Sequence, residues 1–186
     1  DDAFDEDRAD VLERAAEAGV EAVVVIGYDA ASSRQAVEVC RRPSPVLLAA
    51  TAGIAPHHVA EADDAALEHV QASLDEEGVV AVGEIGLDYH YDMPRTAQRE
   101  LFARQLGWAR ERDVPVVIHS REAEDDVAAL LREHGAGADE RPLRGVIHCF
   151  TEGPAMAEAA VYFDFFVSFS GILTFRNAAD LREIAA

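Results

Sequence analysis

Six short apolar runs recur along the chain, and helix-like segments separate them. Each run is rich in β-branched or aromatic residues and nearly free of polar ones, which is typical of parallel strands buried on both faces. The runs are Glu21–Gly27, Val46–Gly53, Val79–Glu84, Val114–His119, Gly145–His148 and Phe163–Gly171. The clearest amphipathic segments are Asp7–Ala18, Ser33–Cys40, Ala62–Leu74, Arg95–Arg112 and Ala123–Glu133. The alternation predicts a single α/β domain over residues 1–186.

Repeated βα units fit either a TIM (β/α)8-type barrel or a doubly wound open sheet. An open sheet of the Rossmann type usually carries GxGxxG after its first strand, whereas the turn here reads GYDAASS from Gly27. In a barrel, functional side chains stand at the carboxyl ends of several strands. Glu84, His119 and His148 each end an apolar run, and His57 follows another. This placement favours the barrel.

The spacing of these residues predicts a metal site. Glu84 and His119 are 35 positions apart, and His119 and His148 are 29 apart, about one βα unit each. Three strand ends in register bring the side chains to one face of the sheet. Imidazole and carboxylate groups suit Zn, Mn, Fe or Mg, and a carboxylate can bridge two cations. We interpret the other histidines as ordinary polar positions: His58, His69, His90 and His134.

Four segments carry a family resemblance. They are GEIGLDYH (Gly83–His90), PVVIHSREAEDD (Pro115–Asp126), GVIHCF (Gly145–Phe150) and SFSGILTFRNA (Ser168–Ala178). In order and spacing they resemble the successive motifs of the TatD family of metal-dependent deoxyribonucleases. The resemblance implies an amidohydrolase-like barrel in which two divalent cations activate a water that cleaves DNA phosphodiester bonds. Mg or Mn would suit nuclease action, and the histidines would also accept Zn.

The resemblance also implies roles for individual residues. Glu84 would bind and bridge both metals, and His119 and His148 would be ligands of one metal. We assign Arg121 to substrate phosphate or to an acidic neighbour; the simpler alternative is a surface salt bridge on the following helix. The family's GxHPH motif reads Gly53-Ile54-Ala55-Pro56-His57 here, so its first histidine is Ala55. His57 is kept as a substrate-binding candidate.

Two family motifs do not occur in this sequence: the HxH of a first strand and a late ETDxP. We therefore expect about six of the eight βα units, with the first and last barrel strands missing. These two strands would be neighbours in a closed barrel. The chain should then be a barrel with an open seam, bordered by the runs that start at Glu21 and Phe163.

Composition indicates adaptation to salt. The net charge is −20, from 36 acidic and 16 basic side chains, and every basic residue is arginine. At about 1 M salt the Debye length falls to roughly 3 Å, which screens the repulsion between carboxylates. A GC-rich genome is the alternative explanation for the missing lysine, although it does not explain the acidic excess.

Three function hypotheses are compatible with these features. The first is a DNA hydrolase, a 3′-5′ exonuclease acting on single-stranded ends. The second is hydrolysis of a small ester, lactone or amide, because fold and metals do not choose the substrate. The third is an inactive fragment, since some ligands are missing.

The same composition bears on partners and location. The sequence has no membrane-length apolar stretch and no leader-like start, and its two cysteines, Cys40 and Cys149, lie outside any CxxC pattern. We therefore expect a cytoplasmic protein with no membrane association and no stable protein partner.

Overall fold

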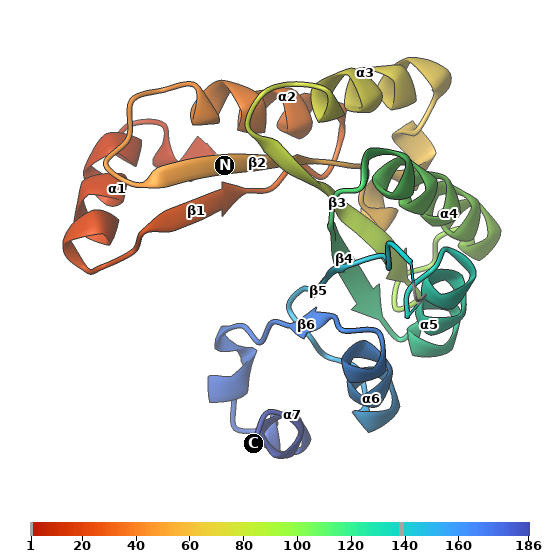
Figure 1. Ribbon diagram of the computed structural model, residues 1–186. Helices are drawn as coiled ribbons and strands as arrows, with labels where there is room; N and C mark the ends of the chain where they lie inside the picture. Colours follow the sequence, from red (N-terminus) through yellow and green to blue (C-terminus); the bar gives the residue numbers. More distant parts are fainter. Residues whose placement is uncertain (1, 138–139) are drawn as a thin grey trace.

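A single curled sheet of six parallel strands forms the centre of the computed structural model, which describes residues 2–137 and 140–186. The strands are β1 (Ala22–Val25), β2 (Leu47–Ala52), β3 (Val79–Asp88), β4 (Val116–Arg121), β5 (Gly145–Ile147) and β6 (Phe166–Val167). They pair in chain order, so that β1 and β6 are the two edges, as predicted. The result is a half-barrel of the predicted α/β type, curved around one open side (Figure 1).

One helix precedes β1, and other helices follow the strands, most of them on the outer side of the curve (Figure 1). They are α1 (Arg8–Glu17), α2 (Ala30–Cys40), α3 (Asp64–Leu74), α4 (Arg95–Arg112), α5 (Glu124–Glu133), α6 (Pro154–Tyr162) and α7 (Ala179–Ile184). Short 3-10 turns are η1 (Asp2–Phe4), η2 (Pro56–Glu61) and η3 (Gly171–Thr174). Asp29 and Asp63 cap α2 and α3, because each carboxylate accepts a backbone N–H of the first turn. No helix in the described ranges is long and apolar enough to cross a membrane.

The core lies between the convex face of the sheet and the helices. Ile85, Ile118 and Ile147, from three neighbouring strands, are fully buried. They belong to one apolar cluster with Phe102 and Leu106 of α4. Because side chains alternate along a strand, the residues directly before and after each of these isoleucines point to the concave face. The concave face therefore carries both apolar and polar side chains, such as Val117 and His119 on either side of Ile118.

Two strand boundaries differ from the prediction. We expected β3 to end at Glu84, but it continues to Asp88, because its ladder with β4 runs to the Asp88–Arg121 pair. β4 was expected to end at His119 and also extends to Arg121. Glu84 and His119 therefore lie inside their strands, and the prediction that they close them is wrong.

The last strand is much shorter than the apolar run that predicted it. The run Phe163–Gly171 contributes only Phe166–Val167 to the sheet. Phe163 follows α6 and is buried in the core, and Asp164 turns the chain with a φ of 60°. Ser170 then caps η3 by accepting the Ile172 N–H. An apolar composition cannot reveal these two turns.

Candidate metal centre

Two carboxylates of β3 point to the concave face. Glu84 and Asp88 are four positions apart on one strand, so they share a face, whereas Ile85 and Leu87 between them belong to the core. Gly86 lies between them on the same side, with a φ of 139°. A Cβ at this position would lie 2.0 Å from the carbonyl oxygen of His119. Glycine therefore allows β3 and β4 to approach closely beside the two carboxylates.

A bulge in β3 accompanies this arrangement. Val82 pairs with Val116 and Ile85 with Ile118, so β3 has two residues where β4 has one. Such a bulge changes the direction of the side chains next to it. Glu84 is one of the two residues in this bulge.

The imidazole of His119, on β4, lies between the two carboxylates. Its Nδ1 is 3.2 Å from Oε1 of Glu84, and its Nε2 is 2.9 Å from Oδ2 of Asp88. His57, in η2, brings its Nε2 to within 3.0 Å of the same Asp88 oxygen. Ligand atoms of His57, Asp88 and His119 all lie within 4.8 Å of one another. Two imidazoles and a carboxylate at this separation have the chemistry of a divalent metal site.

The electrostatics of the cluster keep the carboxylates charged. Burial raises the pKa of Asp88, but hydrogen bonding to His119, its positive charge, the His90 N–H and the charge of His57 outweigh burial and lower it. For Glu84, burial again raises the pKa, while His119, His148 and His57 lower it overall. The two carboxylates in turn raise the pKa of His119 against the effect of burial. The site therefore concentrates negative charge suited to a cation.

Asp88 is the residue that sequence reasoning missed. It lies within the GEIGLDYH segment, in which the sequence predicts Glu84 as the metal ligand. Its side chain is 0% exposed, which is rare for a carboxylate unless it is paired. A signal was present, because a residue four positions after Glu84 on one strand must share its face.

Two glutamines of α4 fix the backbone beside the cluster. Gln98 accepts the N–H of Asp88 at 2.8 Å and donates to its carbonyl at 2.9 Å. Seven positions later, Gln105 makes the same pair of bonds with Ile54, at 2.7 and 2.9 Å. Both glutamines are fully buried. One helix thus holds the segment that follows β2 and the end of β3 by side-chain clasps.

The remaining site candidates occupy different places. His148 follows β5 and donates its backbone N–H to the carbonyl of Ile118 at 2.8 Å, on the strand that carries His119. Its side chain is outside the group of mutually close ligand atoms, although its charge acts on Glu84. Arg121 is the last residue of β4, not part of a helix, and its guanidinium carbon is 5.4 Å from the Tyr91 ring centre. None of the described carboxylates forms an ion pair with Arg121, so both the acidic neighbour and the surface salt bridge are wrong as its partner.

Two histidines interpreted as ordinary positions have carboxylate neighbours. Nδ1 of His90 is 2.7 Å from Oε1 of Glu122. Nδ1 of His58 is 3.3 Å from Oε2 of Glu61 and 3.9 Å from Oδ2 of Asp29, a second group with metal-ligating atoms close together. Glu61 is exposed, and the carboxylate of Asp29 already caps α2. These contacts fit surface ion pairs.

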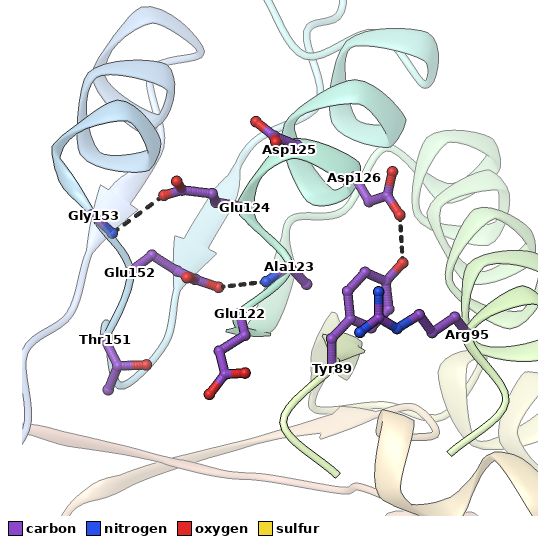
Figure 2. Close-up of a pocket in the computed structure, with 10 residues that line it drawn as sticks. All are labelled: Tyr89, Arg95, Glu122, Ala123, Glu124, Asp125, Asp126, Thr151, Glu152 and Gly153. Carbon is purple, nitrogen blue, oxygen red and sulfur yellow. Dashed lines mark hydrogen bonds between the residues drawn. The ribbon is translucent and has the colours of Figure 1, made fainter. Parts of the chain in front are cut away.

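A pocket of about 490 Å³ is lined by the segments that follow β3, β4 and β5. Figure 2 shows its lining, with Glu152 next to the N–H of Ala123 and Tyr89 next to Asp126. Five carboxylates line it: Glu122, Glu124, Asp125, Asp126 and Glu152. Arg95 is the only basic residue in that lining. So acidic a pocket would repel phosphate unless cations were bound in it.

Comparison with known proteins identifies a family and several relatives of this chain. All 186 residues match the family described as TatD related DNase. The chain is 35% identical over 182 residues to the uncharacterized metal-dependent hydrolase YabD of Bacillus subtilis, covering 97% of this chain and 69% of that protein. It is 31% identical over 183 residues to an Erwinia tasmaniensis protein named 3′-5′ ssDNA/RNA exonuclease TatD, covering 97% and 69%.

A solved structure agrees with this. The crystal structure of YjjV, a TatD homolog from Escherichia coli K12, has a TM-score of 0.87 and 32% identity, covering 98% of this chain and 69% of that one. With YcfH of the same species, 42% identity extends over 131 residues, which is 48% of that protein. The family match, the relatives and the half-barrel agree: the chain belongs to the TatD family of metal-dependent hydrolases.

Proposed function

We propose that this chain hydrolyses phosphodiester bonds of DNA at single-stranded 3′ ends. The observation that carries the proposal is the imidazole of His119 on β4, which lies between the carboxylates of Glu84 and Asp88 on the neighbouring strand β3. The names of two relatives, from Erwinia tasmaniensis and Pantoea vagans, as 3′-5′ ssDNA/RNA exonucleases support the choice of substrate.

The donor atoms fit divalent cations, and the hydrogen bonds suggest a division of roles. One oxygen of Asp88 accepts the backbone N–H of His90 at 3.0 Å, and the other lies against the Nε2 atoms of His57 and His119. A buried carboxylate so occupied orients its histidine partners. If His119 donates its Nε2 proton to Asp88, its Nδ1 lone pair faces Glu84. We therefore assign Glu84 and His119 as metal ligands. We keep His148 as the third ligand, as the sequence predicts, because its charge acts on Glu84.

The chemistry that such ions supply is polarisation of the phosphate and activation of water, and two cations do this together in many nucleases. We propose two Mg²⁺ or two Mn²⁺ ions, and Zn²⁺ is the second choice because imidazoles also bind it. Arg121 stands two positions after His119 on β4, on the same face. We assign its guanidinium to one phosphate oxygen, where it offsets negative charge and fixes the orientation of the diester. His57 would contact the same substrate from η2.

One observation favours a different substrate. A net charge of −20 repels a polyanion, whereas a small neutral ester, lactone or amide is not repelled. Salt and bound cations reduce this repulsion near the site. Turnover of an oligothymidylate, with none of p-nitrophenyl acetate or a lactone, would favour the nuclease. The reverse pattern would favour the second candidate.

The proposal predicts a complete dependence on Glu84. Glu84→Ala should lower hydrolysis of single-stranded DNA in Mn²⁺ by about 100-fold or more, because it removes a proposed ligand. Release of nucleotides, with and without chelator, measures this, and circular dichroism checks the fold. Glu61→Ala is the matched control, since it removes an exposed carboxylate of the second histidine cluster. Wild-type rates in Glu84→Ala, or activity that survives chelation, would contradict the assignment.

A further inference from the structure

The segment after β3 presents an aromatic ring to solvent beside the candidate metal centre. Tyr89 and Tyr91 are two positions apart but have different surroundings. The Tyr89 ring contacts Arg95, with the guanidinium carbon 4.3 Å from its centre, and its hydroxyl donates to Asp126. Tyr91, by contrast, is 51% exposed.

Among the described residues, an arginine and two histidines contact the Tyr91 ring, and each belongs to the candidate site or its border. The guanidinium carbon of Arg121 is 5.4 Å from the ring centre. The rings of His57 and His90 approach at 5.7 and 5.0 Å, with interplanar angles of 67° and 84°. Both are edge-to-face contacts. In the described part of the chain, no aromatic ring stacks parallel on Tyr91, which leaves the ring able to take a stacked partner.

These contacts join the ring to the groups proposed to hold a phosphate. His57 contacts Asp88, and Arg121 follows His119 on β4. A ligand with a flat ring and a phosphate could therefore stack on Tyr91 while Arg121 contacts the phosphate. Nucleotides combine those two features.

The charge of the molecule makes such a contact important. Nonspecific nucleic-acid binding usually comes from basic side chains on the backbone phosphates, and it weakens with salt. A chain with net charge −20 has little of this attraction. Stacking of bases on aromatic side chains, by contrast, tolerates any sequence and depends little on charge.

We propose that Tyr91 forms a nucleobase-binding subsite, where one base of a single-stranded nucleic acid stacks while Arg121 contacts the adjacent phosphate. The inference rests on the proposed nuclease function. It adds a source of affinity that the acidic surface does not provide.

Two matched substrates test the subsite. One is a short oligothymidylate, and the other is a phosphodiester of the same length with an abasic residue at every position. Their backbone charges are equal, so a difference in KM reports on the bases alone. Initial rates with Mn²⁺ give KM and kcat separately for each substrate.

Tyr91→Leu should raise KM for the oligothymidylate about tenfold, with little change in kcat, and leave KM for the abasic substrate unchanged. Tyr91→Phe should retain the wild-type preference, because the ring remains. Tyr28→Leu is the matched control: Tyr28 is 44% exposed, but its stacked partner is His58, at 5.4 Å. It should leave both KM values unchanged.

The outcomes separate the two proposals. A wild-type protein that cleaves neither substrate overturns both the nuclease function and the subsite. Equal KM values for the two substrates in the wild type keep the nuclease function and overturn the subsite. If Tyr91→Leu loses activity on both substrates, the subsite is also overturned, because the ring would then act through the structure of the site.

Discussion

At the scale of single residues, Asp88 shows how its partners keep a buried carboxylate charged. A buried carboxylate without partners would be neutral or strongly destabilising. Asp88 is fully buried but accepts one backbone N–H and lies against two imidazoles. Its charge is therefore retained, and it can hold His119 in one orientation.

Asp126 is a carboxylate whose partners make its contribution depend on pH. Hydrogen bonds from Arg99 and then Tyr89 lower its pKa from 3.8. A lowered folded-state pKa stabilises the protein above the unfolded value, and this stabilisation is lost as pH falls through the folded value. Asp126→Asn should lower the free energy of unfolding at pH 7 by less than about 1 kcal/mol, because Arg99 and Asp126 are more than one-third exposed.

That difference should shrink as the pH falls below 3.8. Urea unfolding of wild type and variant at several pH values measures it. Asp125→Asn is the control, since none of the described basic groups forms an ion pair with Asp125. A difference that is constant with pH, or that grows in acid, would contradict the assigned ion pair.

At the scale of elements, side chains of α4 hold the end of β3 and the segment that follows β2. Gln98 clasps Asp88, and Gln105 clasps Ile54. Gln98→Leu and Gln105→Leu should each lower the free energy of unfolding by about 2–5 kcal/mol, because two buried backbone groups lose their partners. Only Gln98→Leu should also weaken Mn²⁺ binding, by about 10- to 100-fold, since it frees a residue that orients a proposed ligand.

Thermal melts and titration calorimetry measure the two effects separately. The absorption spectrum of bound Co²⁺ should change in Gln98→Leu and stay the same in Gln105→Leu. Equal losses of metal affinity in the two variants would mean that α4 acts only through stability.

At the scale of the whole molecule, charge decides the conditions in which the half-barrel is stable. Several ion pairs among the described residues, such as Arg41–Glu76 and Arg144–Asp113, join exposed side chains, and each is worth little. The net charge of the chain is −20. The melting temperature should rise from dilute buffer to about 1 M KCl, as screening reduces the repulsion. Sucrose at the same osmolality is the control. A flat or falling melting temperature in KCl would leave genome composition as the explanation.

The sequence by itself determined the order of the strands, the parallel sheet and the family. Those properties depend on local patterns: apolar runs, helical periodicity and four short motifs. Local patterns are least informative where several turns lie within one apolar run. For this reason the run Phe163–Gly171 did not predict that β6 is only two residues long. The predicted ends of β3 and β4 were wrong for another reason: the length of a strand depends on its hydrogen-bonded ladder with the neighbouring strand.

Only the tertiary structure decided which side chains meet. Asp88 of β3 contacts His57 of η2 and His119 of β4. Tyr91, which follows β3, contacts Arg121 at the end of β4. These contacts depend on the bulge in β3 and on the close approach at Gly86. Neither leaves a periodic signal, because each is a relation between two strands and not a property of one. The sequence can therefore name the candidates, while sheet register decides how they are grouped.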